Sequence, residues 1–194
     1  HVSNISSHLG NSTEFLREVI GELDNVKTIW EPHGRTARKG FVTDKKFNLF
    51  ANSSGKLAQL KAIIFDEIHA YYLKFQEESC SYIKKWPSEI FLCGWHVVLK
   101  QQGYNTAHIH PTGWLSGVIY LKVVPALGKN EGAIEFSLNS QNYHHKNSPS
   151  LVFQPEVGDI VFFPSSLHHR TIPFTTDTDR IIVSFDLMPE TAKR

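Results

Sequence analysis

Gly158-Asp159-Ile160-Val161-Phe162-Phe163-Pro164 reads as a buried β-strand that begins and ends at turn residues. The run Arg180-Ile181-Ile182-Val183-Ser184-Phe185 follows and reads as another strand. From residue 90 onward the chain consists of such short runs, which predict strands at 90–100, 115–124, 132–138, 150–154, 158–164, 168–173 and 180–188. Strands at this close spacing predict a sandwich or jelly roll.

The first third of the chain reads as helical and connecting. Asn11-Ser12-Thr13-Glu14 predicts a helix start, and apolar residues at helical spacing predict a longer helix from Leu57 to Tyr82. Residues 31–55 are rich in Gly, Asn, Ser, Lys and Arg and predict a long surface connection. The fold class is therefore predicted to be α+β, mostly β, with N-terminal helices packed on one face of a jelly roll.

Length and composition predict a single domain over residues 1–194. Its N-terminal part, 1–89, is expected to be helical and connecting support, and its jelly-roll core is expected at 90–188. The 194 residues are 41% apolar and 20% charged, which is ordinary for a globular protein. The sequence does not begin with Met, which fits a fragment of a longer protein.

Charge and cysteine content restrict the partners and the compartment. A formal charge of +1 gives no reason to expect nucleic acid or a membrane surface as an obligatory partner. No apolar run approaches the ~18 residues that a membrane helix needs. Cys80 and Cys93 are the only cysteines, which favours a reducing compartment and predicts a cytoplasmic protein. Nothing in the sequence predicts an oligomeric state.

The histidines predict a metal site. His108 and His110 are one residue apart, so they point to the same side of an extended strand. His168 and His169 open a later strand, and only one of this pair can face inward. Three converging imidazoles suit Fe, Zn, Cu or Ni. The alternative is a pair of surface histidines near a turn, since Pro111-Thr112-Gly113 follows.

Arg180 predicts a site for an anion. It shares one strand face with Ile182 and Ser184, and an inward-facing arginine needs a carboxylate partner because an unpaired buried charge is costly. A bound dicarboxylate can supply that partner, held by the two-pronged guanidinium and by the Ser184 hydroxyl. The alternative is a surface ion pair with Asp177 or Asp179.

Several segments together resemble a known family. The chain is similar to the Fe(II)/2-oxoglutarate oxygenases related to the prolyl hydroxylases, over roughly residues 35 to 188. The matching segments are Gly40–Thr43, Asn48–Phe50, Gly103-Tyr104-Asn105-Thr106-Ala107-His108-Ile109-His110-Pro111, Ser116–Leu121, Gly158–His169, Pro173, Arg180 and Ser184-Phe185. This resemblance implies a double-stranded β-helix, which is a distorted jelly roll, with supporting helices.

The resemblance also implies a ligand set. His108 and His110 would be the first two metal ligands, and His169 the third, because the family histidine lies four residues before a proline and Pro173 fits. Arg180 would bind the distal carboxylate of 2-oxoglutarate, helped by Ser184. Two further residues, each explained equally well as a strand or turn residue, would also reach the co-substrate: Tyr120 and Asn105.

His110 departs from the wider superfamily, which has Asp or Glu at that position. A neutral imidazole in place of a carboxylate makes the site one unit more positive, which alters the redox potential of the metal and its affinity for water. The resemblance to a His-x-His subfamily implies that His110 is a ligand. The alternative is that His110 turns away and water or substrate takes its place.

The implied function is a non-haem Fe(II)- and 2-oxoglutarate-dependent dioxygenase, most simply a hydroxylase. It would consume O₂, form succinate and CO₂, accept ascorbate as a reductant and act on an unidentified protein side chain or small molecule. Residues 31–55 and 139–149 are the segments expected to contact that substrate. Two alternatives remain: a cupin-like three-His metal enzyme that does not use 2-oxoglutarate, and a non-catalytic jelly-roll binding module.

Overall fold

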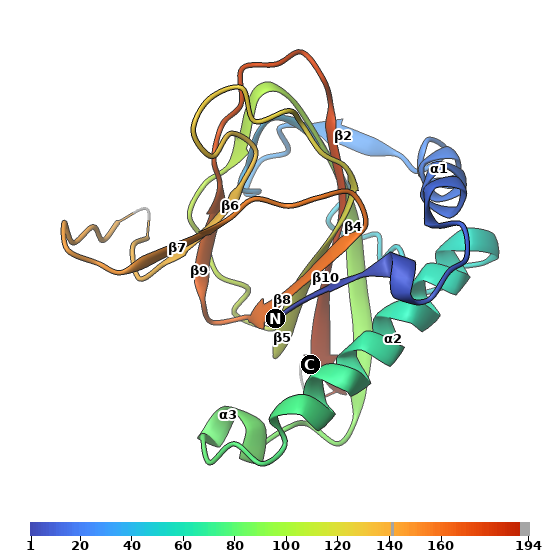
Figure 1. Ribbon diagram of the computed structural model, residues 1–194, viewed down its shortest axis with the longest axis vertical. Coiled ribbons are helices and arrows are strands. Elements are labelled where there is room, and N and C mark those ends of the chain that lie inside the picture. The colour runs from blue at the N-terminus through green and yellow to red at the C-terminus, as the bar shows by residue number, and fades with distance from the viewer. Residues whose placement is uncertain (141, 191–194) are drawn as a thin grey trace.

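The computed structural model describes residues 1–140 and 142–190, in which ten strands form two antiparallel sheets (Figure 1). The larger sheet contains, in spatial order, β1 (Val2–Asn4), β8 (Asp159–Pro164), β5 (Leu115–Lys122), β10 (Arg180–Pro189), β4 (Ile90–Asn105), β3 (Ala37–Thr43) and β2 (Thr28–Trp30). The smaller sheet contains β7 (Ser150–Phe153), β6 (Ile134–Ser137) and β9 (His168–Thr171). This architecture confirms the predicted jelly roll, and every strand expected from residue 90 onward is present.

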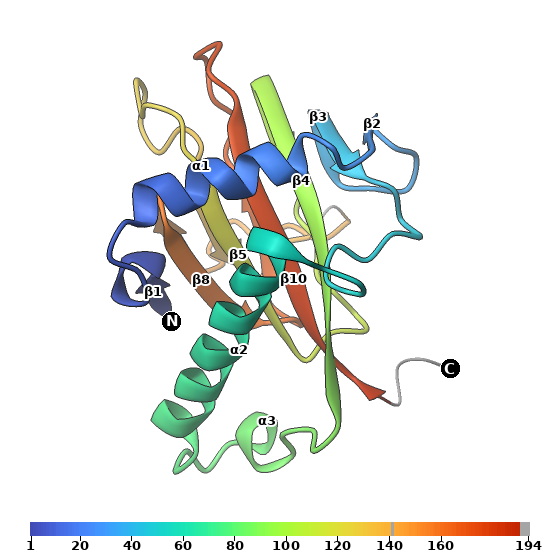
Figure 2. The ribbon, with the colours of Figure 1, turned by 90° about the vertical axis from the view of Figure 1, so that its right-hand side faces the viewer.

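The helices lie against the outer face of the larger sheet (Figure 2). They are η1 (Ile5–Ser7), α1 (Ser12–Leu23), α2 (Gly55–Phe75) and α3 (Ser81–Lys84). The predicted start of α1 is confirmed, because the Asn11 side chain accepts the Glu14 N–H at 3.1 Å. Among the described residues no helix is long and apolar enough to span a membrane.

The predicted helix from Leu57 to Tyr82 is wrong in its extent. α2 ends at Phe75, and a turn closed by a Glu78 N–H to Phe75 carbonyl hydrogen bond separates it from the short α3. The apolar stripe stops at Phe75, so the polar residues that follow have no apolar face to bury against the sheet, and packing rather than propensity sustains a helix in a protein.

The prediction of a long surface connection over residues 31–55 is also wrong in part, because that range contains the partly buried strand β3. This strand pairs with β4, but its register shifts between Arg38 and Gly40, where Lys39 has a φ of +50°. The shift breaks the alternation of apolar and polar side chains that identifies a strand in a sequence. β1 and β2 have only three residues each and carry too short a pattern to be recognised.

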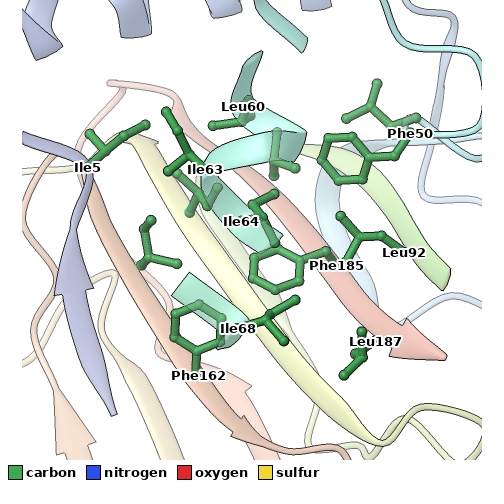
Figure 3. Close-up of a cluster of buried hydrophobic side chains, with 14 of the residues drawn as sticks. Ile5, Phe50, Leu60, Ile63, Ile64, Ile68, Leu92, Phe162, Phe185 and Leu187 are labelled. Atoms are coloured by element: carbon green, nitrogen blue, oxygen red, sulfur yellow. The ribbon is translucent and has the colours of Figure 1, made fainter. Parts of the chain in front are cut away.

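Two apolar cores lie on the two faces of the larger sheet. The outer core joins α1 and α2 to β4, β5, β8 and β10 (Figure 3). The inner core lies between the sheets and contains Val97, Val118, Tyr120, Phe163 and Ile182 with Ile134 and Phe136 of the smaller sheet. β5, β8 and β10 are therefore buried on both faces, which explains their nearly continuous apolar runs.

Acidification is expected to destabilise this fold through His96. The residue shares the helix-covered face of β4 with Leu92 and Gly94, is 4% exposed, and neither ring nitrogen has a hydrogen-bond partner among the described residues. Burial lowers the pKa of His96 to about 4. Between about pH 6.5 and pH 4 the unfolded chain therefore binds a proton that the folded chain does not, so the free energy of unfolding falls with pH by up to about 3 kcal/mol.

Urea unfolding at several pH values between about 4 and 7 measures this effect. His96→Phe is expected to lose a large part of the pH dependence, whereas His69→Gln, at an exposed position on α2, is expected to retain it. An equal pH dependence in wild type and His96→Phe would assign the acid sensitivity to other groups.

Candidate metal and co-substrate site

Three histidine side chains converge between the two sheets. His108 and His110 follow β4, and His169 lies on β9. Their potential ligand nitrogens all lie within 4.8 Å of one another, and Nε2 of His108 is 3.2 Å from Nε2 of His110. The three-imidazole cluster expected from the sequence is therefore present, and His169 rather than His168 completes it.

Backbone hydrogen bonds hold the two segments together. The N–H groups of His108 and His169 each donate to the carbonyl oxygen of the other residue at 3.0 Å, and the His110 N–H donates to the Ser165 carbonyl at 2.9 Å. His108 and His110 thus lie between β4 and β5, outside the regular strands, with one isolated bridge at His108. The extended backbone still brings both side chains to the same cavity.

Two of the imidazoles are fixed in one tautomer. Nδ1 of His108 lies 2.7 Å from the Thr106 carbonyl oxygen, and Nδ1 of His169 lies 3.0 Å from the Leu167 carbonyl oxygen. A carbonyl oxygen only accepts, so both Nδ1 atoms carry the proton and both Nε2 atoms offer a lone pair. Burial, with a smaller contribution from the neighbouring histidines, lowers the pKa of His108 to about 4 and that of His169 to about 2.

This donor set fits a divalent transition metal. Uncharged imidazoles are the form that binds a metal ion, and converging Nε2 lone pairs repel one another unless they share a cation. Imidazole ligands suit iron as well as zinc, copper and nickel. The cluster contains no carboxylate, in agreement with the departure noted at His110.

Asp186 supplies the nearest negative charge to His110. Its Oδ1 lies 2.6 Å from Nδ1 of His110 and accepts a hydrogen bond of 2.6 Å from the Ser116 hydroxyl, which in turn lies 2.8 Å from the Ser165 hydroxyl. Asp186 was not predicted from the sequence as a site residue. Its signal was the strand period, because Asp186 lies two residues after Ser184 and therefore on the same face of β10.

Arg180 lies at the other end of this face and is 2% exposed. Its Nε donates to the Gly132 carbonyl at 3.1 Å, and its guanidinium lies 4.9 Å from the centre of the Tyr120 ring. Nη1 of Arg180 is buried and has no hydrogen-bond partner among the described residues. The alternative of a surface ion pair is not observed, because Asp179 instead pairs with Lys100 at 2.6 Å.

The buried guanidinium fits the distal carboxylate of a 2-oxoglutarate molecule. No ion pair to Arg180 occurs within the described part of the chain, so a bound carboxylate would satisfy both the charge and the free Nη1 donor. The Tyr120 hydroxyl is also buried without a hydrogen-bond partner among residues 1–140 and 142–190. Burial raises the pKa of Tyr120 to about 12, although the Arg180 charge opposes that shift, so its hydroxyl remains a donor.

All seven residues singled out from the sequence line one cavity of about 570 Å³. They are His108, His110, His169, Arg180, Ser184, Tyr120 and Asn105. The Asn105 amide is engaged by two neighbours, because it donates to the Thr171 hydroxyl at 3.3 Å and accepts from the Thr36 hydroxyl at 3.4 Å. The Asn105 side chain therefore links β4 to β9 in the wall of the cavity.

A second pocket, here called the outer pocket, adjoins this cavity and has a volume of about 710 Å³. It shares Arg35, Thr36 and His108 with the inner cavity. Its walls include residues 31–36, Arg38, Ser140 and Asn142, which belong to the two segments expected to contact a substrate. His168, the histidine that does not join the cluster, also lines it.

Part of the chain matches a known protein family. Residues 94–186 match the family model described as "Putative 2OG-Fe(II) oxygenase", where 2OG is 2-oxoglutarate. A comparison with curated proteins finds no match for the chain.

Solved structures share the fold at low sequence identity. A prolyl-4-hydroxylase from Pseudomonas putida is 12% identical with a TM-score of 0.60, over 92% of this chain and 88% of that one. A prolyl hydroxylase from Trichoplax adhaerens, in complex with a peptide of the hypoxia inducible factor oxygen degradation domain, is 12% identical with a TM-score of 0.65, over 100% and 84%. HygX from Streptomyces hygroscopicus, with nickel and 2-oxoglutarate bound, is 10% identical with a TM-score of 0.56, over 92% and 79%.

The family match covers most of β4, all of β5 to β9 and most of β10, and with them the three histidines and Arg180. The structural neighbours share the jelly-roll architecture that carries these residues. Residues 94–186 therefore match the 2OG-Fe(II) oxygenase family, and this match together with the shared fold indicates an Fe(II)- and 2-oxoglutarate-dependent oxygenase.

Proposed function

We propose that the protein is a hydroxylase in which His108, His110 and His169 bind Fe(II) and Arg180 binds the distal carboxylate of 2-oxoglutarate. Together, bound Fe(II) and 2-oxoglutarate supply the activation of dioxygen that oxidises a second substrate and leaves succinate and CO₂. The observation that carries the proposal is one cavity with three converging imidazoles at one end and a buried, incompletely paired arginine at the other.

The protein side chains have separate tasks in this proposal. The Thr106 and Leu167 carbonyls hold His108 and His169 in the neutral form in which Nε2 offers its lone pair to a metal. The site is therefore organised before the metal binds. The Asp186 carboxylate accepts a hydrogen bond from Nδ1–H of His110 and so orients this imidazole. It also places one negative charge next to a set of three uncharged ligands.

The co-substrate tasks fall to β10 and β5. Arg180 binds the distal carboxylate of 2-oxoglutarate with charge-assisted hydrogen bonds. Ser184 lies four residues further along β10, on the same face of the strand. Tyr120 packs its ring against the guanidinium and keeps a phenol donor available in the cavity. The apolar side chains Val118 and Ile182 exclude water around these groups.

Turnover of 2-oxoglutarate without any second substrate tests the proposal. The protein is incubated in air with Fe(II), 2-oxoglutarate and ascorbate, which supplies the two electrons otherwise taken from the second substrate, and succinate is quantified. We expect succinate from the wild type and a loss of at least about 1,000-fold in His169→Ala, because removing a metal ligand removes the metal.

His144→Ala is the matched control, because His144 is an exposed loop histidine. It is expected to form succinate at the wild-type rate, and the unfolding midpoint of each variant shows that its fold is retained. Equal succinate formation by wild type and folded His169→Ala would contradict the assignment. Absence of succinate from the wild type, with metal bound, would favour a three-His enzyme that does not use 2-oxoglutarate.

A further inference from the structure

The outer pocket reaches the histidine cluster at His108, and Arg180 is not among its lining residues. Arg35 lies in the wall between the outer pocket and the inner cavity and lines both. A molecule in the outer pocket thus lies next to His108, whereas Arg180 lines the inner cavity alone. This is the position expected of the substrate that is oxidised, and it places the Arg35 side chain beside it.

The backbone holds Arg35 in place. A turn is closed by the Arg35 N–H to the Pro32 carbonyl at 3.1 Å, with Gly34 at a φ of +76° that suits glycine. The carbonyl of the next residue, Thr36, accepts a hydrogen bond of 3.0 Å from the N–H of Thr106, which lies just before the His-x-His segment. Arg35 is therefore tied to the same stretch of chain that positions His108.

The guanidinium of Arg35 lacks a protein partner. Its Nε is buried without a hydrogen-bond partner, and the side chain makes no ion pair, among residues 1–140 and 142–190. Asp186, the acidic residue that lines the inner cavity, is engaged by His110 and Ser116. A half-buried guanidinium in this position favours an oxyanion, which accepts two hydrogen bonds from its planar fork.

The remaining charged groups of the outer pocket favour the same ligand. Arg38 also lines it, so that two arginines stand against one acidic lining residue, Glu31, which accepts a hydrogen bond from the Lys39 backbone N–H. Arg38 donates to the Arg35 carbonyl at 2.8 Å, which brings a second guanidinium to the same wall. The outer pocket is therefore positively charged where it meets the histidine cluster.

We propose that the primary substrate is a small molecule with a carboxylate or phosphate group, and that Arg35 binds this oxyanion in the outer pocket. The proposal rests on the proposed function, because it concerns the second substrate of that reaction. A volume of about 710 Å³ is in the range of small-molecule sites, which favours a metabolite-sized acid over a protein segment.

Binding of sulfate, a simple oxyanion, tests the site directly. Fe(II)-loaded protein saturated with 2-oxoglutarate is titrated with sulfate without oxygen and at constant ionic strength, and heat is measured. We expect saturable binding in the millimolar range, weakened about 10- to 100-fold in Arg35→Leu because charge-assisted hydrogen bonds are lost. Arg170→Leu is the matched control. Arg170 is an exposed residue of β9 that pairs with Glu135 of β6, so this variant should bind sulfate like the wild type.

Three results of this titration would overturn the proposal. The first is the absence of saturable sulfate binding in the wild type, and the second is equal binding in Arg35→Leu with an unchanged unfolding midpoint. The third is competition between sulfate and 2-oxoglutarate, which would place Arg35 in the co-substrate site.

Turnover then identifies the source of the oxyanion. Carboxylic acids and phosphate monoesters, each beside its neutral ester or amide, are tested for stimulation of succinate formation. We expect stimulation by anionic members, a loss of at least about tenfold in kcat/KM for their neutral counterparts, and a raised KM for the anionic substrate in Arg35→Leu. Stimulation by neutral compounds alone, or by an acidic peptide alone, would contradict the proposal.

Succinate formed without a second substrate separates the two proposals. Its absence in a protein that still binds sulfate at Arg35 counts against the proposed function. Its presence in a protein that binds no sulfate counts against the oxyanion site alone.

Discussion

Arg180→Leu is expected to weaken 2-oxoglutarate binding to the Fe(II)-loaded protein about 100- to 1,000-fold. Arg180 is 2% exposed and forms no ion pair with the described residues. In Arg180→Leu, a carboxylate bound at this buried position would therefore have no positive charge beside it. Removing one partner of a buried charge pair costs several kcal/mol, because the other charge stays desolvated. Isothermal titration with 2-oxoglutarate in the absence of oxygen measures this loss.

The stability of the metal-free protein is not expected to fall in Arg180→Leu. A buried guanidinium with a free Nη1 donor and no carboxylate partner destabilises the fold, so Arg180→Leu should unfold at a urea concentration equal to or higher than that of the wild type. Binding and stability thus give independent readouts of the same residue.

Arg170→Leu is the matched control for Arg180→Leu. Arg170 lies on β9, is exposed and pairs with Glu135, so this variant should bind 2-oxoglutarate like the wild type. If Arg180→Leu bound 2-oxoglutarate within about threefold of the wild type, Arg180 would not be its carboxylate partner.

Asp186→Asn is expected to lower Fe(II) affinity about 10- to 100-fold while the fold is retained. The substitution keeps the size of the side chain but removes the negative charge 2.6 Å from Nδ1 of His110. A ligand that loses its carboxylate partner becomes a weaker electron donor, and an asparagine can also present its amide N–H and turn the imidazole. Competition with a chelator measures the affinity, and Co(II) in place of Fe(II) gives a visible spectrum that reports the ligand geometry.

Asp179→Asn is the matched control for Asp186→Asn. Asp179 precedes β10 and pairs with Lys100 at the surface side of that strand, so the same substitution there should leave metal affinity unchanged. Fe(II) affinity in Asp186→Asn within about threefold of the wild type would show that the Asp186 carboxylate does not support His110 as a ligand.

The jelly roll was predictable because its strands from residue 90 onward are apolar runs between turn residues. β5, β8 and β10 are buried on both faces, so burial left a strong pattern in their sequence. β3 was not predictable, because the bulge at Lys39 shifts the register and destroys the alternation. Arg35 lies just before β3, within the segment 31–55 that was expected to contact the substrate, but no sequence pattern singled out Arg35 itself.

The candidate site was predictable where its residues lie close together in sequence or share a strand face. His108 and His110 are near neighbours, and Arg180 and Ser184 follow the period of β10. The contact of Asp186 with His110 joins positions 76 residues apart, and no local pattern encodes such a pairing. The tautomers of His108 and His169 depend on the carbonyls of Thr106 and Leu167, which only the folded backbone positions.

The central claim is that three histidines and one arginine bind Fe(II) and 2-oxoglutarate in one cavity, and a titration without oxygen tests it most directly. Metal-free protein is titrated with 2-oxoglutarate before and after one equivalent of Fe(II), and bound 2-oxoglutarate is measured by calorimetry. We expect 2-oxoglutarate to bind at least about tenfold more tightly once Fe(II) is present, and this gain to disappear in His169→Ala. Equal 2-oxoglutarate affinity with and without Fe(II), or an Fe(II)-dependent gain that persists in folded His169→Ala, would contradict the claim.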